Sequence, residues 1–411
     1  MSDQIVIIGA GEAGARAAIS LRELGYPGKI TMIGDEPFLP YERPPLSKSA
    51  LIADLAPEPP KLILNAKSLV FQRIELLSNR LAKMINRSEK SVLLDDGRVL
   101  SYAKLLLATG ASPRKMTANG SSEVFYLRNF ADALKLREQL QPATELIVVG
   151  AGFIGLEIAA SAVARGCKVT VLESAPAILM RGVPANVAHQ VSERHKAESV
   201  EILTSVSVEA ISKQGPRSEV LLKDGRKLQC DLLVAGIGAV PTTSLAEDSG
   251  IAIENGIRVD EFLNTNDPDI YAAGDCCSFP HALYDGRRIR LEAWRNAQDQ
   301  AVVAAANILG AKQPYQTVPW FWSDHYDCTL QVAGLYDAQC GTIERQLDNA
   351  SIYFHVNKAG RLIAASAIGP NAAIGREIRV CEMLIAQRYM ANSVLLENPA
   401  IRLKDLLQRV A

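Results

Sequence analysis

The chain has 411 residues, of which 48% are hydrophobic and 22% charged, and its formal net charge is −1. This is the composition of an ordinary globular protein, long enough for two or three domains. A net charge near zero gives no reason to expect a nucleic acid partner. No basic and apolar leader precedes the first expected strand at Ile5, and no apolar run reaches membrane-spanning length. We therefore predict a cytoplasmic protein that contacts neither nucleic acid nor membrane.

The cysteines form neither a CxxC pair nor a metal-ligand spacing. There are seven of them: Cys167, Cys230, Cys276, Cys277, Cys328, Cys340 and Cys381. We expect buried or free thiols, a reducing compartment and no metal site.

The first motif is IVIIGAGEAG, which starts at Ile5. Its glycines, which follow an apolar strand, are Gly9, Gly11 and Gly14. Glycine is required where the backbone turns sharply and then approaches a pyrophosphate at a helix N-terminus. A helix is expected over 13–24, and a second strand over 30–33 leads to Asp35, an acid suited to a ribose hydroxyl. This is a complete dinucleotide-binding βαβ unit.

The same motif returns as LIVVGAGFIG from Leu146. Its glycines are Gly150, Gly152 and Gly155. A helix is expected over 156–165, and a strand over 169–172 ends at Glu173. A single copy of the motif could be an accidental glycine-rich turn. Two copies, each with its strand, helix, second strand and terminal acid, argue strongly against that alternative. Two nucleotide sites in one chain indicate that electrons pass between two nucleotides.

Further segments repeat within each half of the chain. Hairpins are expected over 91–100 and 220–228, each followed by a buried strand that ends in small residues, LLLATGASP from Leu105 and DLLVAGIGAVP from Asp231. Small residues let the backbone pass close to a nucleotide. The proline-rich stretch 40–60 is predicted to be an ordered loop without regular helix.

A third region begins at LNTNDPDIYAAGDCCSF. Asp275 follows an apolar strand and Gly274, a position suited to a ribose or ribityl hydroxyl, although turn aspartates are also common before helices. A long helix is expected over 294–309. The remainder, 319–411, has alternating runs and then a helix over 373–386, which indicates a small α+β domain without a glycine motif of its own.

The predicted fold is therefore α/β, with two Rossmann-like dinucleotide-binding domains and a small α+β C-terminal domain. The predicted boundaries are 1–114 with 246–318 for a discontinuous first dinucleotide-binding domain, 115–245 for a second dinucleotide-binding domain and 319–411 for the C-terminal domain.

With both glycine motifs, Leu107–Gly110 and Tyr271–Asp275 in this order, the chain resembles the two-dinucleotide-binding-domain flavoproteins, the glutathione reductase superfamily. Within it, PYERPPLSK (40–48), GFIGLE (152–157) and PWFWSD (319–324) resemble the FAD-dependent NADH:ferredoxin reductases. These serve bacterial cytochrome P450 and ring-hydroxylating dioxygenase systems. The resemblance covers essentially the whole chain. It implies FAD and NADH as cofactors and an acidic [2Fe-2S] ferredoxin as partner, with an oxygenase downstream and a monomer or weak homodimer.

The resemblance also implies the site residues. Those expected at FAD are Gly9, Gly11, Ala13, Gly14, Asp35, Arg43, Lys48, Ala82, Ala108, Thr109, Gly110, Arg128, Gly274, Asp275, Glu292, Ala293 and Trp294. Those expected at NADH are Gly150, Gly152, Phe153, Ile154, Gly155, Glu157, Glu173 and Gly238. No metal ligand is implied.

Lys48 and Glu157 are the predicted catalytic pair. A lysine beside a flavin favours the anionic reduced ring, and a buried carboxylate would hold it in place. The alternative is a pair of ordinary surface charges. Phe153 is expected either to gate the nicotinamide face or to pack in the core. Glu173 favours NADH, because a carboxylate accepts hydrogen bonds from a free 2′-hydroxyl and repels a 2′-phosphate.

The loop 41–48 contains no cysteine, although disulfide reductases of this superfamily need a thiol beside the flavin. Electrons are therefore expected to leave directly, to a one-electron iron-sulfur carrier. The arginines near the flavin-contacting stretch form either a docking patch for an acidic ferredoxin or a solvated loop: Arg287, Arg288, Arg290 and Arg295. Trp320 and Trp322 are expected to pack, with a place at the electron exit as the alternative.

Two rival functions remain open on the sequence. One is direct reduction of a small molecule or O2, as in NADH oxidases. The other is a binding or signalling role of the apoptosis-inducing-factor type.

Overall fold

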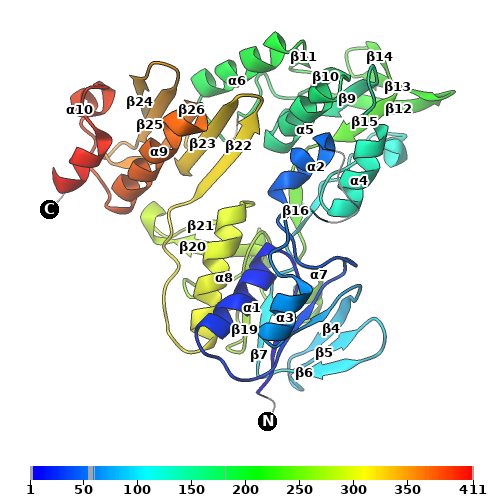
Figure 1. Ribbon diagram of the computed structural model, residues 1–411, viewed down its shortest axis with the longest axis vertical. Helices are drawn as coiled ribbons and strands as arrows, with labels where there is room; N and C mark the ends of the chain where they lie inside the picture. Colours follow the sequence, from blue (N-terminus) through cyan, green and yellow to red (C-terminus); the bar gives the residue numbers. More distant parts are fainter. Residues whose placement is uncertain (1–2, 54–58, 60, 181, 410–411) are drawn as a thin grey trace. The chain divides into compact units, whose positions relative to one another are not determined.

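The computed structural model describes residues 3–53, 59, 61–180 and 182–409 (Figure 1). The chain divides into two compact units. The first unit comprises Met1–Pro45, Leu55–Ser112 and Ala239–Thr317, and the second comprises Leu46–Asp54, Pro113–Gly238 and Val318–Ala411. The sequence predicted three domains, and their boundaries stay a prediction, since this division into two units does not test them. In the described ranges, no helix is long and apolar enough to cross a membrane.

A five-stranded parallel sheet, in the order β19-β7-β1-β2-β3, is the centre of the first unit. Its strands are β1 (Ile5–Ile8), β2 (Ile30–Ile33), β3 (Ile74–Leu77), β7 (Lys104–Leu107) and β19 (Ile270–Ala272). Strands β1 and β2 are fully buried, as expected for a parallel sheet covered on both faces. Helix α1 (Glu12–Glu23) follows β1 and packs against α8 (Trp294–Ile308) (Figure 1).

Smaller elements complete the first unit. An antiparallel sheet contains β4 (Ala82–Asn86), β5 (Ser91–Leu94) and β6 (Val99–Ser101). A mixed sheet contains β17 (Ile253–Glu254), β18 (Gly256–Arg258), β20 (Cys277–His281) and β21 (Arg287–Ile289). The helical segments are α3 (Ala66–Phe71), α7 (Ser244–Asp248) and η3 (Ala282–Tyr284). The short helix η1 (Pro44–Ser47) begins in the first unit and ends in the second. The short strands β8 (Ala111–Pro113) and β16 (Ala239–Pro241) pair where the chain passes from one unit to the other.

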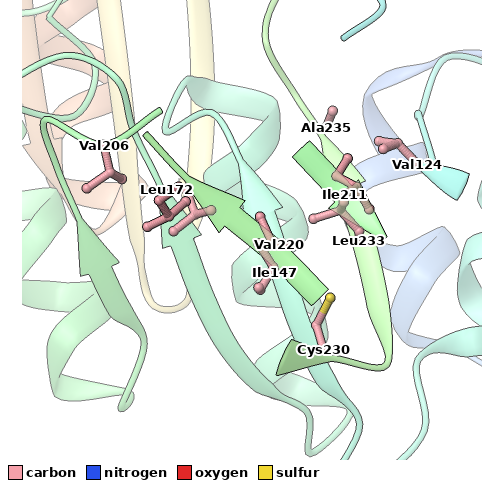
Figure 2. Close-up of a cluster of buried hydrophobic side chains, with 10 residues drawn as sticks. Val124, Ile147, Leu172, Val206, Ile211, Val220, Cys230, Leu233 and Ala235 are labelled. Atoms are coloured by element: carbon pink, nitrogen blue, oxygen red, sulfur yellow. The ribbon is translucent and has the colours of Figure 1, made fainter. Parts of the chain in front are cut away.

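A second parallel sheet, in the order β11-β10-β9-β15, lies in the second unit. Its strands are β9 (Glu145–Val149), β10 (Lys168–Leu172), β11 (Glu201–Leu203) and β15 (Leu232–Ala235), and the antiparallel sheet beside it contains β12 (Val208–Gln214), β13 (Arg217–Leu222) and β14 (Lys227–Cys230). The helices of this part are α2 (Ser49–Ile52), α4 (Phe130–Gln139), α5 (Phe153–Ala164), α6 (Ala185–Ala197) and η2 (Ser121–Glu123). Both sheets contribute to one apolar cluster that includes Ile147, Leu172, Val220 and Leu233 (Figure 2).

The last part of the chain forms a five-stranded antiparallel sheet in the order β22-β23-β26-β25-β24. Its strands are β22 (Trp320–His325), β23 (Cys328–Gly334), β24 (Gly341–Gln346), β25 (Ser351–Val356) and β26 (Leu362–Gly369). Helix α9 (Asn371–Ala386) packs on β23 and β26, and α10 (Ser393–Glu397) and η4 (Leu403–Arg409) follow. Buried Arg345 donates to the carbonyls of Leu395, Leu396 and Ile401, so it ties this C-terminal segment to β24.

The expected strands, hairpins and long helices are present, with ends that differ by one to three residues. The prediction of a loop without helix over 40–60 is wrong for 44–52, where η1 and α2 form. Proline fixes φ near the helical value and needs no N–H in a first turn, so it is compatible with such short helices. Pro57 and Pro60 lie outside the described residues.

Candidate functional site

The first glycine turn joins β1 to α1, and its three glycines have different surroundings. Gly9 has φ +111°, and a Cβ there would lie 2.1 Å from the Ala108 carbonyl oxygen. A Cβ at Gly14 would lie 1.8 Å from the Gly9 oxygen. At Gly11 the nearest atom is Arg43 Nη2, 3.7 Å away. The outer glycines are thus needed for the turn and its packing. A Cβ at the middle one would make only ordinary van der Waals contact, so the protein itself does not require glycine there, whereas the close approach of a pyrophosphate would.

The second turn, between β9 and α5, repeats this arrangement. Gly150 has φ +100°, and its Cβ would lie 2.5 Å from the Gly236 carbonyl oxygen. A Cβ at Gly155 would lie 2.1 Å from the Gly150 oxygen, while the nearest atom to one at Gly152 is 3.9 Å away. Each unit therefore holds one glycine turn at a helix N-terminus, which we call a cradle: residues 9–14 in the first unit and 150–155 in the second. Backbone N–H groups at such an end bind phosphates.

The small-residue strand ends lie against these turns, as the sequence predicted. Thr109 Oγ1 donates to the Thr242 carbonyl at 2.6 Å, and Gly110 has φ +68°. In the second unit, Gly238 has φ +101° and accepts from the Arg114 N–H at 2.9 Å.

Glu173 stands at the end of β10, beside the second turn. Its Oε2 accepts from the Ala151 N–H at 2.8 Å, and its Oε1 accepts from the Ala175 N–H at 2.8 Å. These bonds hold the carboxylate next to the helix N-terminus of the cradle, the position expected for a ribose-binding acid. No arginine or lysine occupies positions 174 or 175.

The acidic end of β2 contains a second acid besides the predicted Asp35. Asp35 is exposed, whereas its neighbour Glu36 accepts from Tyr41 Oη at 2.5 Å and from Arg43 Nη2 at 2.7 Å. Arg43 also borders Gly11. Glu36 thus fixes the guanidinium that lies beside the first cradle. Glu36 was not among the predicted site residues.

Ala82, at the start of β4, lies near that same acidic end. The N–H groups of Asn79 and Arg80 donate to the carbonyls of Glu36 and Gly34 at 3.0 and 2.9 Å. This pairing joins the segment before the buried Ala82 to the end of β2; the contact of Ala82 with adenine stays a prediction.

Gly274 and Asp275 follow β19 at a turn pressed against α1. Gly274 has φ +85°, and a Cβ there would lie 3.1 Å from Ala13 Cβ. The Gln300 side chain accepts from the Gly274 N–H at 2.8 Å. The turn therefore places Asp275 close to the first cradle.

The predicted stretch 292–294 leads into α8. Glu292 pairs with Arg290 at 2.6 Å, Ala293 is the N-cap residue and Trp294 is the first helical residue. Because α8 packs on α1, residues 292–294 lie on a helix start that neighbours the helix of the first cradle.

Lys48 and Glu157 form an ion pair in the second unit. Lys48 Nζ lies 2.9 Å from Glu157 Oε1, and the glutamate side chain is 4% exposed while the lysine side chain is 23% exposed. Asp324 Oδ2 lies 3.8 Å from the same ammonium group. The alternative of two ordinary surface charges is therefore wrong.

Two serines complete the hydrogen bonding of Glu157. Ser47 Oγ donates to Oε2 at 2.5 Å, and Ser323 Oγ donates to Oε1 at 2.7 Å. Ser161 Oγ in turn donates to the Ser47 carbonyl at 2.6 Å. A buried carboxylate bound in this way keeps one position, and it holds Lys48 with it.

Aromatic side chains surround this pair. The Phe153 and Phe321 rings meet edge to face with centroids 4.9 Å apart, which favours the packing role for Phe153. The neighbouring Ile154 is 48% exposed. Trp320 and Trp322 stack at 5.3 Å, and Lys48 Nζ lies 5.6 Å from the centroid of the Trp322 ring.

Arg128 directly precedes α4 in the second unit. Its N–H donates to Asp132 Oδ2 at 3.0 Å, within a capping box formed with Asn129. Its expected contact with FAD stays a prediction.

Comparison with known proteins places this geometry in a family. Residues 3–301 match the model of the pyridine nucleotide-disulphide oxidoreductases, and residues 320–407 match that of the reductase C-terminal domain. The chain belongs to the pyridine nucleotide-disulphide oxidoreductase family. Family membership confirms the predicted fold class. It also implies the two predicted cofactors, FAD and NADH.

Three similar proteins extend over nearly the whole chain. The ferredoxin–NAD(+) reductase component of the anthranilate 1,2-dioxygenase system of Burkholderia cepacia is 38% identical, over 99% of this chain and 100% of its own. The ferredoxin reductase for the CYP199A2 system from Rhodopseudomonas palustris is 36% identical, with a TM-score of 0.91 and coverage of 98% and 99%. The covalent putidaredoxin reductase–putidaredoxin complex matches at 33% identity, with a TM-score of 0.92 and coverage of 99% of each chain.

The cysteines set this oxidoreductase apart from the disulphide chemistry in its family's name. All seven are free, and Cys276 and Cys277 in the first unit are completely buried. Burial raises the pKa of both thiols, which makes them poor nucleophiles. Among the described residues, no group of three or more potential ligands could hold a metal ion.

The arginine cluster is mostly paired within the chain. Arg288 pairs with Glu254 at 2.6 Å and Arg290 with Glu292 at 2.6 Å. Arg295 lies 3.6 Å from Asp299. These pairs favour the alternative of a loop with balanced charges over a docking patch of four arginines.

Proposed function

We propose that this oxidoreductase carries electrons from NADH through FAD to a ferredoxin. The observation that carries the proposal is the pair of glycine turns in one chain, each at a helix N-terminus and each with a middle glycine that no contact within the protein requires. Similarity at full length to ferredoxin reductases supports the choice of acceptor. When bound, FAD accepts a hydride from NADH and returns the electrons one at a time, chemistry that no side chain supplies.

The first cradle is the proposed FAD site. Gly9, Gly11 and Gly14 let the backbone of α1 meet the pyrophosphate, and Arg43 adds a positive charge at its border. Asp35 and Asp275 are the proposed partners of the sugar and ribityl hydroxyls, because both stand at the ends of parallel strands beside this turn.

The second cradle is the proposed NADH site. Glu173 is held where the adenosine ribose is expected, and as a carboxylate it accepts from a 2′-hydroxyl and repels a 2′-phosphate. NADH is therefore the proposed donor, and NADPH is disfavoured.

Lys48 and Glu157 are the proposed catalytic pair, and their place at the flavin rests on the family resemblance. Lys48 supplies a positive charge whose position is fixed by Glu157, Ser47 and Ser323. Neither residue takes a proton from a substrate in this proposal. The pair sets the electrostatic potential, as a fixed ion pair does in a site with little water.

The proposed acceptor is an acidic [2Fe-2S] ferredoxin that serves a P450 or a ring-hydroxylating dioxygenase. Without a thiol relay, electrons leave the protein directly. Arg288, Arg290 and Arg295 are paired with carboxylates, so a positive potential that attracts an acidic ferredoxin has to come from other surfaces.

A coupled assay tests the proposal. Purified protein is mixed with a panel of [2Fe-2S] ferredoxins and cytochrome c, and reduction is followed with NADH or NADPH while O2 uptake is measured in parallel. We expect NADH-dependent cytochrome c reduction that requires a ferredoxin. Equal use of NADPH would contradict the nucleotide assignment, and O2 uptake that no ferredoxin outpaces would favour direct reduction of a small molecule.

A further inference from the structure

Glu12 occupies an unusual place in the first cradle. It is the residue between Gly11 and Ala13, in the first turn of α1. This end of α1 is where the pyrophosphate of a dinucleotide binds. An ionised carboxylate there would stand beside two phosphate charges, and like charges at close range repel.

The Glu12 side chain is turned toward α8. Its Oε1 accepts from Gln298 Nε2 at 2.8 Å. Its Oε2 is buried, and Trp294 is a further polar neighbour of the carboxylate. A carboxylate with a buried oxygen is costly when charged, whereas a protonated one costs less.

Charged and polar side chains from several segments act on Glu12. Glu42 and Lys61 act on it with opposite signs, and Gln298 and Trp294 on α8 are its polar neighbours. Burial is the largest effect and raises the pKa of Glu12 to about 7, with Glu42 adding to the rise and Gln298, Trp294 and Lys61 opposing it. Both protonation states are therefore populated near neutral pH before any nucleotide binds.

We propose that Glu12 is a proton-linked residue of the FAD site, protonated when the pyrophosphate is bound at α1. This inference rests on the proposed assignment of FAD to the first cradle. Binding then takes up one proton from solvent, which converts the Glu12 carboxylate to a neutral carboxyl group and removes the charge repulsion. Flavin retention consequently weakens as the pH rises.

Isothermal titration calorimetry measures the proton that the protein takes up when FAD binds. Apoprotein is titrated with FAD at about pH 8 in two buffers of different ionisation enthalpy, and the difference in heat gives the number of protons taken up. With half-ionisation at about pH 7 in the free protein, the expected uptake is roughly 0.9 proton per FAD. The dissociation constant should rise by about tenfold or more between pH 7 and pH 8.5.

Glu12→Gln is the decisive variant, because the amide keeps the shape and cannot titrate. It should bind FAD without proton uptake and with a dissociation constant that changes less than about twofold over the same range. Glu23→Gln is the matched control, since Glu23 ends the same helix and pairs with Arg16 at the surface. That control should behave as the unchanged protein does.

Different results would contradict the role of Glu12 and the binding of FAD at the first cradle. Uptake below about 0.2 proton by the unchanged protein, or uptake that persists in Glu12→Gln, would overturn the role of Glu12. Failure of the apoprotein to bind FAD at any pH would instead overturn the assignment of the first cradle. If Glu12→Gln does not fold, the proton count of the unchanged protein and the pH dependence of flavin release from the holoprotein decide the question.

Discussion

Glu157 and Ser323 lie 166 residues apart in sequence, yet Ser323 Oγ donates to Glu157 Oε1 at 2.7 Å. The same carboxylate binds Lys48, so one glutamate joins the proline-rich segment, α5 and β22 of the second unit. Removing it leaves the ammonium group without its buried counter-charge. Removing Lys48 leaves the carboxylate bound by two serines but without a cation.

The first prediction concerns the flavin midpoint potential. Glu157→Gln should raise the two-electron potential, because Lys48 then keeps only the more distant Asp324 as counter-charge and favours the anionic reduced ring more strongly. Lys48→Met should lower it. Each shift should reach about 30 mV, which for two electrons corresponds to about 1.4 kcal/mol. Redox titration checks both, with exposed Glu209→Gln as control, and shifts of the same sign would contradict the electrostatic role.

The second prediction concerns nucleotide choice. Glu173→Gln should lower kcat/KM for NADH by about tenfold, since a charged acceptor is replaced by a weaker neutral one. It should also raise activity with NADPH, because the repulsion of the 2′-phosphate is gone. Steady-state kinetics with both nucleotides measure the ratio. Glu209→Gln, which changes an exposed carboxylate on β12, should leave that ratio unchanged, and an equal effect there would argue against Glu173.

The third prediction concerns pH and two buried histidines. His195 Nε2 lies 3.3 Å from His325 Nδ1, and burial lowers the pKa of each imidazole to about 3. The unfolded value is near 6.5, so the unfolded chain binds more protons below that pH. The stabilisation is complete above about pH 6.5 and is lost progressively as the pH falls toward 3, by about 1.4 kcal/mol per pH unit for each histidine.

Denaturant unfolding at pH 7 and pH 5 measures this slope. His325→Gln should reduce it, because one group no longer titrates. His189→Gln, which changes an exposed histidine on α6, should leave it unchanged. An unchanged slope in His325→Gln would show that the pair does not control acid stability.

The fourth prediction concerns the C-terminal segment. Arg345 donates three hydrogen bonds to backbone carbonyls, and lysine cannot reproduce that fork. Arg345→Lys should destabilise the protein by about 2–3 kcal/mol, because buried carbonyls lose their donors. Hydrogen exchange should show faster opening around α10 while α5 stays protected. Unchanged exchange in α10 would contradict the anchoring role.

Local sequence signals were sufficient for the cradles. The three glycines of each turn, the apolar strand before them and the acid after the next strand all lie within one βαβ unit, where periodicity and turn chemistry are visible. The position of Glu173 beside the second glycine turn could therefore be predicted without a structure.

The partners that complete the site could not be predicted from the sequence in this way. Ser47 and Ser323 reach Glu157 across 110 and 166 residues, and no local pattern marks such long-range contacts. Strands β22 and β24 were also not predicted. Both are edge strands of their sheet, where polar residues are tolerated and the alternation of apolar side chains weakens. Glu12 was missed because its burial depends on α8, nearly 290 residues later in the chain.

The most direct test of the central claim is anaerobic stopped-flow mixing of the NADH-reduced protein with an oxidised [2Fe-2S] ferredoxin, with O2 as the acceptor in a matched experiment. The account predicts stepwise one-electron reduction of the ferredoxin with a second-order rate constant at least about a hundredfold above that for O2, within the usual range for protein association. Equal or faster oxidation by O2 with every ferredoxin tried would contradict it.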